Sequence, residues 1–228
     1  MNNLVFDIGA NKGDTVNDFF KEGYKKVVAV EPIPQFADLL NSRFRDKNFV
    51  LVPKALSSYE GEIDFYLNVQ ESTLCTVSKE WINESRFTPN YDWHKEPIKV
   101  ECTTLDRLID EFGEPNLIKI DVENHEHEVL KGLTKNICSE IKFEWHEEKY
   151  KNAQEACEIL FGLGYNKFYC TAGTEGGVDN IVPESEKIPE KIKVLGGESW
   201  VQLDEEIKNI LPSKTPTHPY WGMIFAKK

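Results

Sequence analysis

The sequence has few cysteines and no pattern that would make them crosslinks or metal ligands. There are five among 228 residues, an odd number, and no two are spaced Cys-x-x-Cys. Disulfide frameworks and zinc sites normally need paired cysteines at short, regular spacings. We therefore expect reduced, mostly buried thiols, as is typical of a cytoplasmic protein.

Long apolar runs and basic clusters are also missing. No stretch approaches the roughly 18 apolar residues of a membrane span. The first residues lack the basic-then-apolar order of a signal peptide, so we expect none. Acidic residues outnumber basic ones by 39 to 27, which gives a formal net charge of −12. Because a negative field repels phosphate backbones, we expect no nucleic-acid partner, although a small patch for one nucleotide is compatible with this charge.

What the sequence does contain is an alternation of short apolar runs with helical patterns. Strands are predicted at residues 4–8, 26–30, 49–52, 62–67, 98–102, 117–120, 141–145, 166–170 and 222–226. Helices are predicted at residues 15–23, 35–44, 104–112, 125–133 and 153–163. Right-handed crossovers between such elements predict an α/β fold, a Rossmann-like doubly wound, mostly parallel sheet with helices on both faces.

Two segments interrupt this alternation. Residues 68–97 form a polar, variable loop whose aromatic side chains suit either stacking on a sugar ring or packing of the loop onto the domain. Residues 171–220 are rich in Gly, Pro, Glu and Lys, with one helix predicted at about Val201 to Leu211. They contain too few apolar residues for a separate core, so we expect one domain over residues 1–228, with an insertion or lid at 171–220.

The most specific segment reads VFDIGANKGD from Val5 to Asp14, a strand followed by a turn of small residues and a helix start. Gly9 permits a tight turn and close backbone approach to a ligand, and Gly13 permits close contact at the helix start. Glu31 ends the next predicted strand, where a carboxylate can accept hydrogen bonds from the ribose hydroxyls of an adenosine. The turn and the acid together indicate an adenosine-containing cofactor.

The glycine pattern distinguishes between adenosine cofactors. In the G-x-G-x-x-G pattern of dinucleotide sites, the three positions are here Gly9, Asn11 and Asp14, so two glycines are missing. Asp7 and Asp14 also place negative charge near a helix N-terminus, which opposes a pyrophosphate. S-adenosylmethionine has no phosphate and carries a cationic amino group and sulfonium, so it suits these carboxylates better. A nicotinamide-dependent oxidoreductase remains the less favoured alternative.

Four segments together resemble the FkbM family of methyltransferases. They are FDIGANKGD at 6–14, VEP at 30–32, TLD at 104–106 and IKIDVENHEHEVLKG at 118–132. The resemblance spans about residues 4–165 and implies the class I methyltransferase fold. It also implies transfer of a methyl group from S-adenosylmethionine to an oxygen, often on a sugar or natural-product scaffold, with S-adenosylhomocysteine as the product. The acceptor is then a small molecule or a glycan.

The same resemblance implies a role for each matching segment. The turn after the first strand would hold the methionine part of the cofactor, Glu31 the ribose, and residues 55–57 the adenine, with Ser72 and Thr73 near the cofactor. Asp121, Glu123 and Glu126 match the family's acidic cluster. The expected cofactor-binding residues are Asp7, Gly9, Ala10, Asn11, Gly13, Thr15, Glu31, Pro32, Ala55, Leu56, Ser57, Ser72 and Asp121.

One residue in the acidic segment departs from the family pattern. Asn124 stands where the family usually has glycine after the second acid of the cluster. Asparagine tolerates left-handed backbone geometry, so the turn can survive the change.

Transfer to a weakly acidic hydroxyl requires removal of its proton, for which a general base typically contributes about 10²–10⁴-fold. The candidate bases are Asp121, Glu123, Glu144 and His146. They form two pairs at the ends of two strands, and the members of each pair share a face. His146 suits a base near neutral pH. The neighbouring Glu147 and Glu148 are interpreted as surface charge.

Two further interpretations complete the set. The segment DVENHEH at 121–127 permits a divalent metal, Mg²⁺ or Ca²⁺ rather than zinc, if it is extended. A helix from His125 would instead turn His125 and His127 apart and towards solvent, so no metal ligands are assigned. The other interpretation is a methyltransferase fold retained for binding without catalysis. It would be favoured if Glu31 or Asp121 did not face the cleft.

Overall fold

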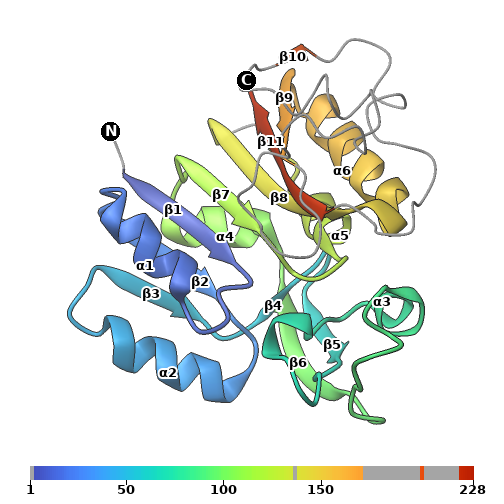
Figure 1. The fold of residues 1–228 in the computed structure, drawn as a ribbon. Coiled ribbons are helices and arrows are strands. Elements are labelled where there is room, and N and C mark those ends of the chain that lie inside the picture. Colours follow the sequence, from blue (N-terminus) through green and yellow to red (C-terminus); the bar gives the residue numbers. More distant parts are fainter. Residues whose placement is uncertain (1–2, 136–137, 172–200, 203–220) are drawn as a thin grey trace.

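The computed structural model describes residues 3–135, 138–171, 201–202 and 221–228. Within them, an eight-stranded sheet has the order β10-β9-β11-β8-β7-β1-β2-β3 (Figure 1). Its strands are β1 (Leu4–Ile8), β2 (Lys26–Val30), β3 (Phe49–Val52), β7 (Leu117–Ile120), β8 (Glu140–His146), β9 (Lys167–Cys170), β10 (Val201–Gln202) and β11 (Trp221–Lys227).

The predicted fold class is confirmed by the strand directions. β1 pairs in parallel with β2 and β7, and β2–β3 and β7–β8 are parallel as well. β11 runs antiparallel between β8 and β9. The sheet is therefore doubly wound, mostly parallel and Rossmann-like, and the carboxyl ends of its parallel strands meet at one edge.

Helices cover both faces because the side chains of β1 alternate between two cores. Val5 packs with apolar residues of α1 and α2 on one face. Leu4, Phe6 and Ile8 pack with α4, α5 and α6 on the other. The helices are α1 (Asp14–Lys21), α2 (Pro34–Phe44), α4 (Leu105–Phe112), α5 (Glu126–Lys131) and α6 (Tyr150–Gly162).

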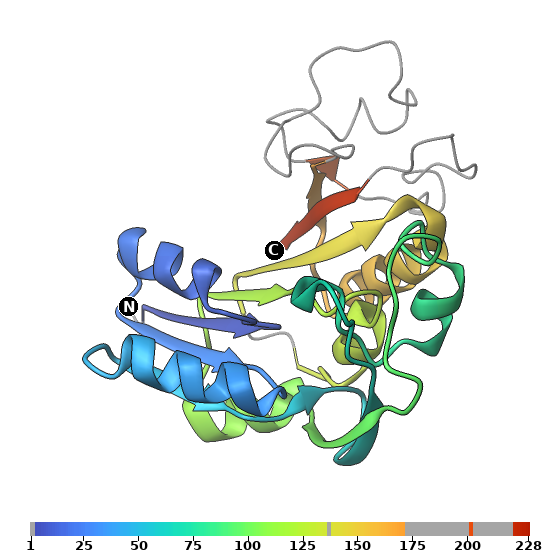
Figure 2. The same ribbon diagram turned by 60° about the horizontal axis from the view of Figure 1, so that its bottom comes forward.

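A three-stranded sheet, ordered β4-β6-β5, lies beside the carboxyl ends of the main sheet (Figure 2). It consists of β4 (Ala55–Leu56), β5 (Gly61–Phe65) and β6 (Ile98–Thr103). A small core that includes Phe65, Val100 and Cys102 also contains Ile33, which follows β2. This core holds the loop between β5 and β6 against the edge where the parallel strands end.

The loop at 68–97 is more ordered than its polar composition suggested. It contains a 3₁₀ turn, η1 (Ser72–Leu74), and a short helix, α3 (Lys79–Glu84). The Ser78 hydroxyl caps α3 by accepting the Trp81 N–H, and the Trp81 side chain is fully buried. Burial of one large aromatic side chain thus stabilises a helix that is too short to show a period in the sequence.

The helix predicted to start at Val201 is wrong at its first residues. Val201 and Gln202 form β10, which pairs antiparallel with β9. The remainder of that helix, and nearly all of the insertion or lid at 171–220, lies outside the described residues. None of the helices that the structure describes has the length and apolar character needed to cross a bilayer.

Candidate active site

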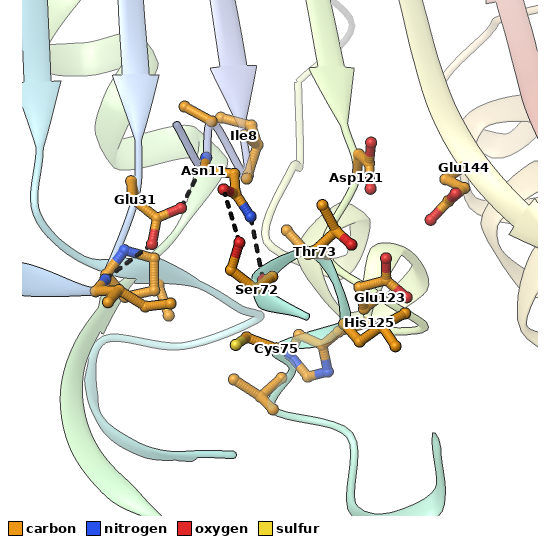
Figure 3. Close-up of a pocket in the computed structure, with 18 of the residues that line it drawn as sticks. Ile8, Asn11, Glu31, Ser72, Thr73, Cys75, Asp121, Glu123, His125 and Glu144 are labelled. Atoms are coloured by element: carbon orange, nitrogen blue, oxygen red, sulfur yellow. Dashed lines mark hydrogen bonds between the residues drawn. The ribbon is translucent and has the colours of Figure 1, made fainter. Parts of the chain in front are cut away.

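A cavity of about 630 Å³ opens where β1, β2, β7 and β8 end (Figure 3). The loop that carries η1 forms its opposite wall. Its volume falls in the usual range for small-molecule sites. Ligands of open α/β sheets bind at this edge, so the cavity lies where the topology expects a cofactor.

The turn after β1 brings two strand ends into contact. Gly9 has φ +80°, and a Cβ built on it would overlap the backbone carbonyl oxygen of Asp121 at the end of β7. Gly9 and Ala10 both donate their backbone N–H to the Val30 carbonyl at the end of β2. Only glycine combines this left-handed geometry with such close approach. The turn therefore holds three strand ends together at the cavity.

Glu31 follows β2 and ties this turn to the small sheet. Its Oε2 accepts the Asn11 N–H at 2.9 Å and its Oε1 accepts the Ile33 N–H at 2.8 Å. The Asn11 side-chain amide donates to the Ser72 carbonyl at 3.1 Å (Figure 3). Glu31 is only 4% exposed, and burial raises its pKa to about 7 despite these backbone donors. It lines the cavity where a ribose acceptor is expected.

Most of the predicted site residues line this cavity, and three do not. Those that line it are Gly9, Ala10, Asn11, Thr15, Glu31, Pro32, Ala55, Leu56, Ser72, Asp121, Glu123, Glu144 and His146. Those that lie outside the lining are Asp7, Gly13 and Ser57.

Each of these three residues contacts a neighbouring element or a residue that lines the cavity. Gly13 has φ +87°, and a Cβ there would come within 2.5 Å of Leu40 Cδ2, so it permits the contact of α1 with α2. Ser57 Oγ lies 3.2 Å from His125 Nε2. Asp7 is fully buried and faces Lys119, with 3.2 Å between Oδ1 and Nζ. Asp7 therefore acts on Lys119 rather than adding free negative charge at the start of α1.

Lys119 joins the end of β7 to the turn after β1, and the sequence does not predict this role. Its Nζ lies 3.3 Å from Asp121 Oδ2 and donates to the Gly9 carbonyl at 3.3 Å. Burial alone would lower the pKa of this amine, but the carboxylates of Asp121 and Asp7 outweigh burial and raise it. Lys119 is thus a buried cation held by two acids. Lys119 lies inside the segment at 118–132 that carries the family resemblance, but the sequence assigns it no role, because it is one charged residue in an otherwise apolar strand.

The acidic turn after β7 is left-handed at two consecutive residues. Glu123 has φ +56° and Asn124 has φ +69°, so asparagine does adopt the geometry for which the family uses glycine. The Thr76 hydroxyl donates to the Glu123 carbonyl at 2.6 Å, and Trp81 Nε1 donates to Glu123 Oε2 at 3.1 Å. The loop at 68–97 therefore holds the Glu123 carboxylate in place. Glu126 lies outside the cavity lining, and its Oε1 accepts the Val122 N–H.

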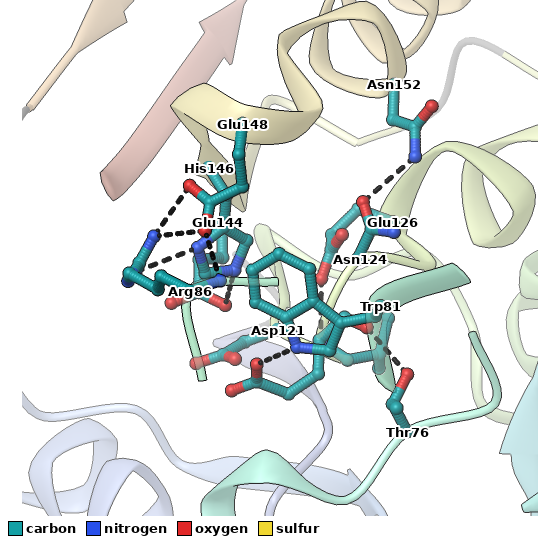
Figure 4. A network of polar contacts seen from close by, with 12 residues as sticks. Thr76, Trp81, Arg86, Asp121, Asn124, Glu126, Glu144, His146, Glu148 and Asn152 are labelled. Atoms are coloured by element: carbon teal, nitrogen blue, oxygen red, sulfur yellow. Dashed lines mark hydrogen bonds and ion pairs between the residues drawn. The ribbon is translucent and has the colours of Figure 1, made fainter. Parts of the chain in front are cut away.

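His146 is buried, and both of its ring nitrogens are engaged (Figure 4). Nδ1 lies 3.3 Å from the Arg86 guanidinium, and Nε2 lies 3.1 Å from Glu144 Oε2. Arginine only donates, so Nδ1 must accept, and Nε2 carries the hydrogen that it donates to Glu144. Burial and then the Arg86 charge lower the pKa of His146 to about 4. His146 is therefore a neutral donor, which argues against its expected role as a base near neutral pH.

The interpretation of Glu147 and Glu148 as surface charge is wrong. Glu147 is 1% exposed. Both carboxylate oxygens of Glu148 accept from Arg86 Nη1, at 2.9 and 2.7 Å, and these two side chains are 10% and 9% exposed. Arg86 brings the loop at 68–97 over Glu148 from a distant part of the sequence. No local pattern predicts that coverage.

Two cavity carboxyls have raised pKa values. Burial raises the pKa of Glu123 well above its ordinary value, and the charges of Glu144 and Asp121 add to this. For Glu144 burial is again the main cause, followed by Asp121 and Glu126. A carboxyl with a raised pKa can take a proton near neutral pH, as a general base must.

A metal is compatible with this cluster by distance but not by hydrogen bonding. Among the described residues, Glu123, Glu144 and His146 bring one ligand atom each within 4.8 Å of one another. Ligation by His146 Nε2 would move its hydrogen to Nδ1, against the Arg86 donors. The set at 121–127 is not brought together, since His125 precedes α5 and contacts Ser57. His125 and His127 are half-buried, so their expected exposure to solvent is wrong.

The sheet order, the cavity at the carboxyl ends of the parallel strands and a family match together identify an S-adenosylmethionine-dependent methyltransferase. Residues 7–167 match the model of the methyltransferase FkbM domain, and the chain belongs to this family. A search of curated proteins found no match.

Solved structures resemble the chain at low sequence identity. One is a precorrin-6y C5,15-methyltransferase from Geobacter metallireducens, with 11% identity, 99% of this chain and 80% of that chain covered, and a TM-score of 0.45. Another is a putative RNA methyltransferase from Pyrococcus horikoshii, with 10% identity, coverages of 99% and 72%, and a TM-score of 0.46. A third is a TehB-like S-adenosylmethionine-dependent methyltransferase from Corynebacterium glutamicum, with 10% identity, coverages of 99% and 80%, and a TM-score of 0.38.

Proposed function

We propose that the protein transfers the methyl group of S-adenosylmethionine to a hydroxyl of an uncharged acceptor, a sugar, glycan or natural-product-like molecule. The observation that carries this proposal is the chemistry of the cavity near β7 and β8. Asp121, Glu123, Glu144 and His146 all line this part, which we call the acceptor end. Carboxylates there suit both hydrogen bonding to a polyol and removal of a hydroxyl proton.

The opposite part of the cavity, the cofactor end, consists of the turn after β1, Glu31 and the residues around them. Glu31 would accept hydrogen bonds from the ribose hydroxyls, Ala55 and Leu56 would flank the adenine, and Asn11 with Ser72 would lie near the methionine part. Gly9 lines this end of the cavity and permits the close approach of the turn to the end of β7. When bound, S-adenosylmethionine supplies an electrophilic methyl group.

Charge at the acceptor end favours a neutral acceptor. Four cations line the cavity in the described part of the chain: Arg86 and Lys119 lie beside the acceptor-end carboxylates, whereas Lys12 and Lys54 belong to the turn after β1 and the segment before β4, at the cofactor end. Glu148 pairs with Arg86, and Asp7 and Asp121 pair with Lys119. A phosphate or carboxylate would therefore meet carboxylates without a free cation and would be repelled. The same argument supports the expectation of no nucleic-acid acceptor.

Glu144 is the best candidate for the base. Its Oε2 accepts from His146, and the burial that raises its pKa makes it a stronger base than an exposed carboxylate. Glu144 would take the hydroxyl proton while the acceptor oxygen bonds to the methyl carbon and the bond from that carbon to sulfur breaks. Asp121 and Glu123 would bind and orient the acceptor from the neighbouring turn, and His146 would orient Glu144.

The test combines two measurements, the affinity for the cofactor product and the rate of methyl transfer. Calorimetric titration should show binding of S-adenosylhomocysteine and not of NAD. Transfer from labelled S-adenosylmethionine should then favour neutral polyols over their phosphate esters. Glu144→Gln should lower kcat about 10²–10⁴-fold with the affinity for S-adenosylhomocysteine unchanged. Glu128→Gln is the control, because Glu128 lies outside the cavity lining and pairs with Lys131.

Four results would contradict the proposal. Full turnover by Glu144→Gln would remove the assigned base. Preference for phosphorylated acceptors would remove the neutral acceptor. Binding of NAD alone would favour the oxidoreductase, whereas binding of neither ligand would favour a fold retained without catalysis.

A further inference from the structure

Arg86 reaches the acceptor end from the loop between β5 and β6. Its guanidinium contacts residues of two other elements, Glu148 in η2 (Glu147–Lys149) and His146 at the end of β8 (Figure 4). The side chain is 9% exposed and lines the cavity. Arg86 acts on His146 in two ways: its guanidinium faces Nδ1 with an N–H that can only donate, and its charge disfavours protonation of the imidazole.

We propose that Arg86 is a positioning residue that fixes the tautomer of His146 and thereby prepares Glu144 for proton removal. This inference rests on the proposed role of Glu144. The chain of contacts runs from the Arg86 guanidinium to Nδ1 of His146, and from Nε2 of His146 to Oε2 of Glu144. Each contact has one possible direction, since arginine cannot accept a hydrogen bond.

The tautomer of His146 determines whether an N–H or a lone pair faces the Glu144 carboxylate. With the hydrogen on Nε2, His146 donates to the Glu144 carboxylate and stabilises its ionised form. With the hydrogen on Nδ1, the Nε2 lone pair would face the carboxylate oxygen and repel it. Arg86 excludes this second arrangement, because it would place two N–H groups against each other. Trp81 holds the imidazole plane, with ring centroids 4.4 Å apart.

The surrounding charges do not change the direction of the hydrogen bond from His146 to Glu144. His146 faces Arg86, Glu126, Glu148 and Asp121 in addition to Glu144. Burial and Arg86 keep the imidazole neutral despite these acids. Glu144 itself faces Asp121, Glu126, Glu123 and Lys119 besides His146. Most of these neighbours disfavour ionisation of Glu144. The hydrogen bond from His146 opposes them, because it stabilises the ionised carboxylate.

The first experiment determines the tautomer of His146 and needs no methyl acceptor. Nitrogen-15 NMR of histidine-labelled protein distinguishes protonated from unprotonated ring nitrogens, and loss of the signals in His146→Gln assigns them. We expect His146 to carry its hydrogen on Nε2 and to stay neutral from pH 5 to 8. Arg86→Lys keeps a cation for Glu148 but removes the planar donor, so Nδ1-protonated or charged imidazole should appear. A wild-type His146 that titrates near pH 6.5, or holds its hydrogen on Nδ1, overturns the proposal.

The second experiment measures kcat and its pH profile, and compares variants that remove the hydrogen bonds of His146 with one that can replace them. The amide of His146→Gln can accept from Arg86 through oxygen and donate to Glu144 through nitrogen, whereas His146→Leu can do neither. We expect His146→Leu and Arg86→Lys to lower kcat about 10- to 100-fold and to move the acidic limb of its pH profile upwards. His146→Gln should recover most of this loss. All should bind S-adenosylhomocysteine normally, which also checks that they fold.

Lys149→Gln is the matched control for loosening the loop. Lys149 joins η2 to α3 through Glu80 and Glu84 without touching His146, so its kcat and pH profile should stay at the wild-type values. If Lys149→Gln shows the same pH shift as Arg86→Lys, or if His146→Gln is as impaired as His146→Leu, the positioning role is overturned. Full turnover by Glu144→Gln would instead contradict the proposed base, and the NMR result would still report on the tautomer.

Discussion

The two ends of the cavity are built in different ways. At the cofactor end, Gly9, Asn11 and Glu31 come from one strand–helix–strand unit, and Glu31 accepts from backbone N–H groups. At the acceptor end, side chains from the loop at 68–97, the turn after β7, and β8 with η2 bond mainly to one another. The first end is defined by backbone geometry and the second by side-chain identity.

This difference predicts how each end tolerates change. Backbone geometry is sensitive to any residue that cannot adopt it, whichever ligand is bound. A network of side chains can lose one member and keep the fold, while its chemistry changes. The predictions below test this difference in order of decreasing effect.

The largest effect is expected at Gly9. Gly9→Ala places a Cβ onto the Asp121 carbonyl oxygen at a positive φ, so it should lower the free energy of unfolding by about 3 kcal/mol or more and abolish binding of S-adenosylhomocysteine. Gly23→Ala is the control, since Gly23 has φ +95° and no atom within 4 Å of the added Cβ. It should cost only about 1–2 kcal/mol. Denaturant unfolding and calorimetry measure both, and equal losses would contradict the steric argument.

A smaller effect is expected at Glu31. Glu31→Ala should weaken binding of S-adenosylhomocysteine about 10- to 100-fold, because hydrogen bonds to a charged group contribute about 1.5–3 kcal/mol. Glu62→Ala, an exposed acid on β5, is the calorimetric control and should change nothing. Near-normal affinity in Glu31→Ala would remove the assigned ribose acceptor.

The pKa of Glu31, raised to about 7, gives this prediction a pH signature. Affinity should rise between pH 6 and 8, as Glu31 ionises and accepts hydrogen bonds more strongly, and this rise should be missing in Glu31→Ala. The free energy of unfolding should behave oppositely. The native state binds more protons than the unfolded state between pH 4.5 and 7, so the contribution of Glu31 is present below pH 4.5 and is lost as the pH rises through 7.

The smallest effect is expected at Asp14. It is exposed and pairs with Arg43 at 2.9 Å, and such surface pairs contribute about 0–1 kcal/mol. Asp14→Asn should therefore leave unfolding and binding of S-adenosylhomocysteine nearly unchanged, with Asp18→Asn as the control at another exposed pair. It should also not create NAD binding, because the missing glycines remain missing. Micromolar NAD binding by this variant would show that one charge alone selects the cofactor.

The sequence predicted the cofactor end better than the acceptor end for a physical reason. A parallel strand, a glycine turn and an acid at the next strand end are local patterns, so the residues around Gly9 and Glu31 could be read together. Asp7 was expected to bind the cofactor, but it lies outside the cavity lining. The local pattern could not show this, since a strand residue beside a turn can face the core instead of the ligand. The partner that turns it there, Lys119, lies in a strand more than a hundred residues away.

At the acceptor end the sequence identified the carboxylates and His146 but not their environment. The spacing of Glu144 and His146 was sufficient to place both on one face of β8. Their protonation depends on Arg86 and Trp81, which the loop brings from sixty residues away, and this loop has no periodic pattern. Burial of Glu148 could not be predicted for the same reason, because charged residues are mostly exposed unless a distant partner such as Arg86 covers them.

The position of β11 has a consequence for the order in which the molecule forms during its synthesis. β8 and β9 are separated in the sheet by β11, whose Trp221 pairs with His146 in register about 75 residues later in the chain. At 5–20 residues per second, the ribosome needs roughly 4–15 s to supply that strand. During this interval the unit around β1 and β2 can already fold, while β8 presents an unpaired edge. Chaperones that recognise exposed strands would therefore meet the nascent chain at the free edge of β8.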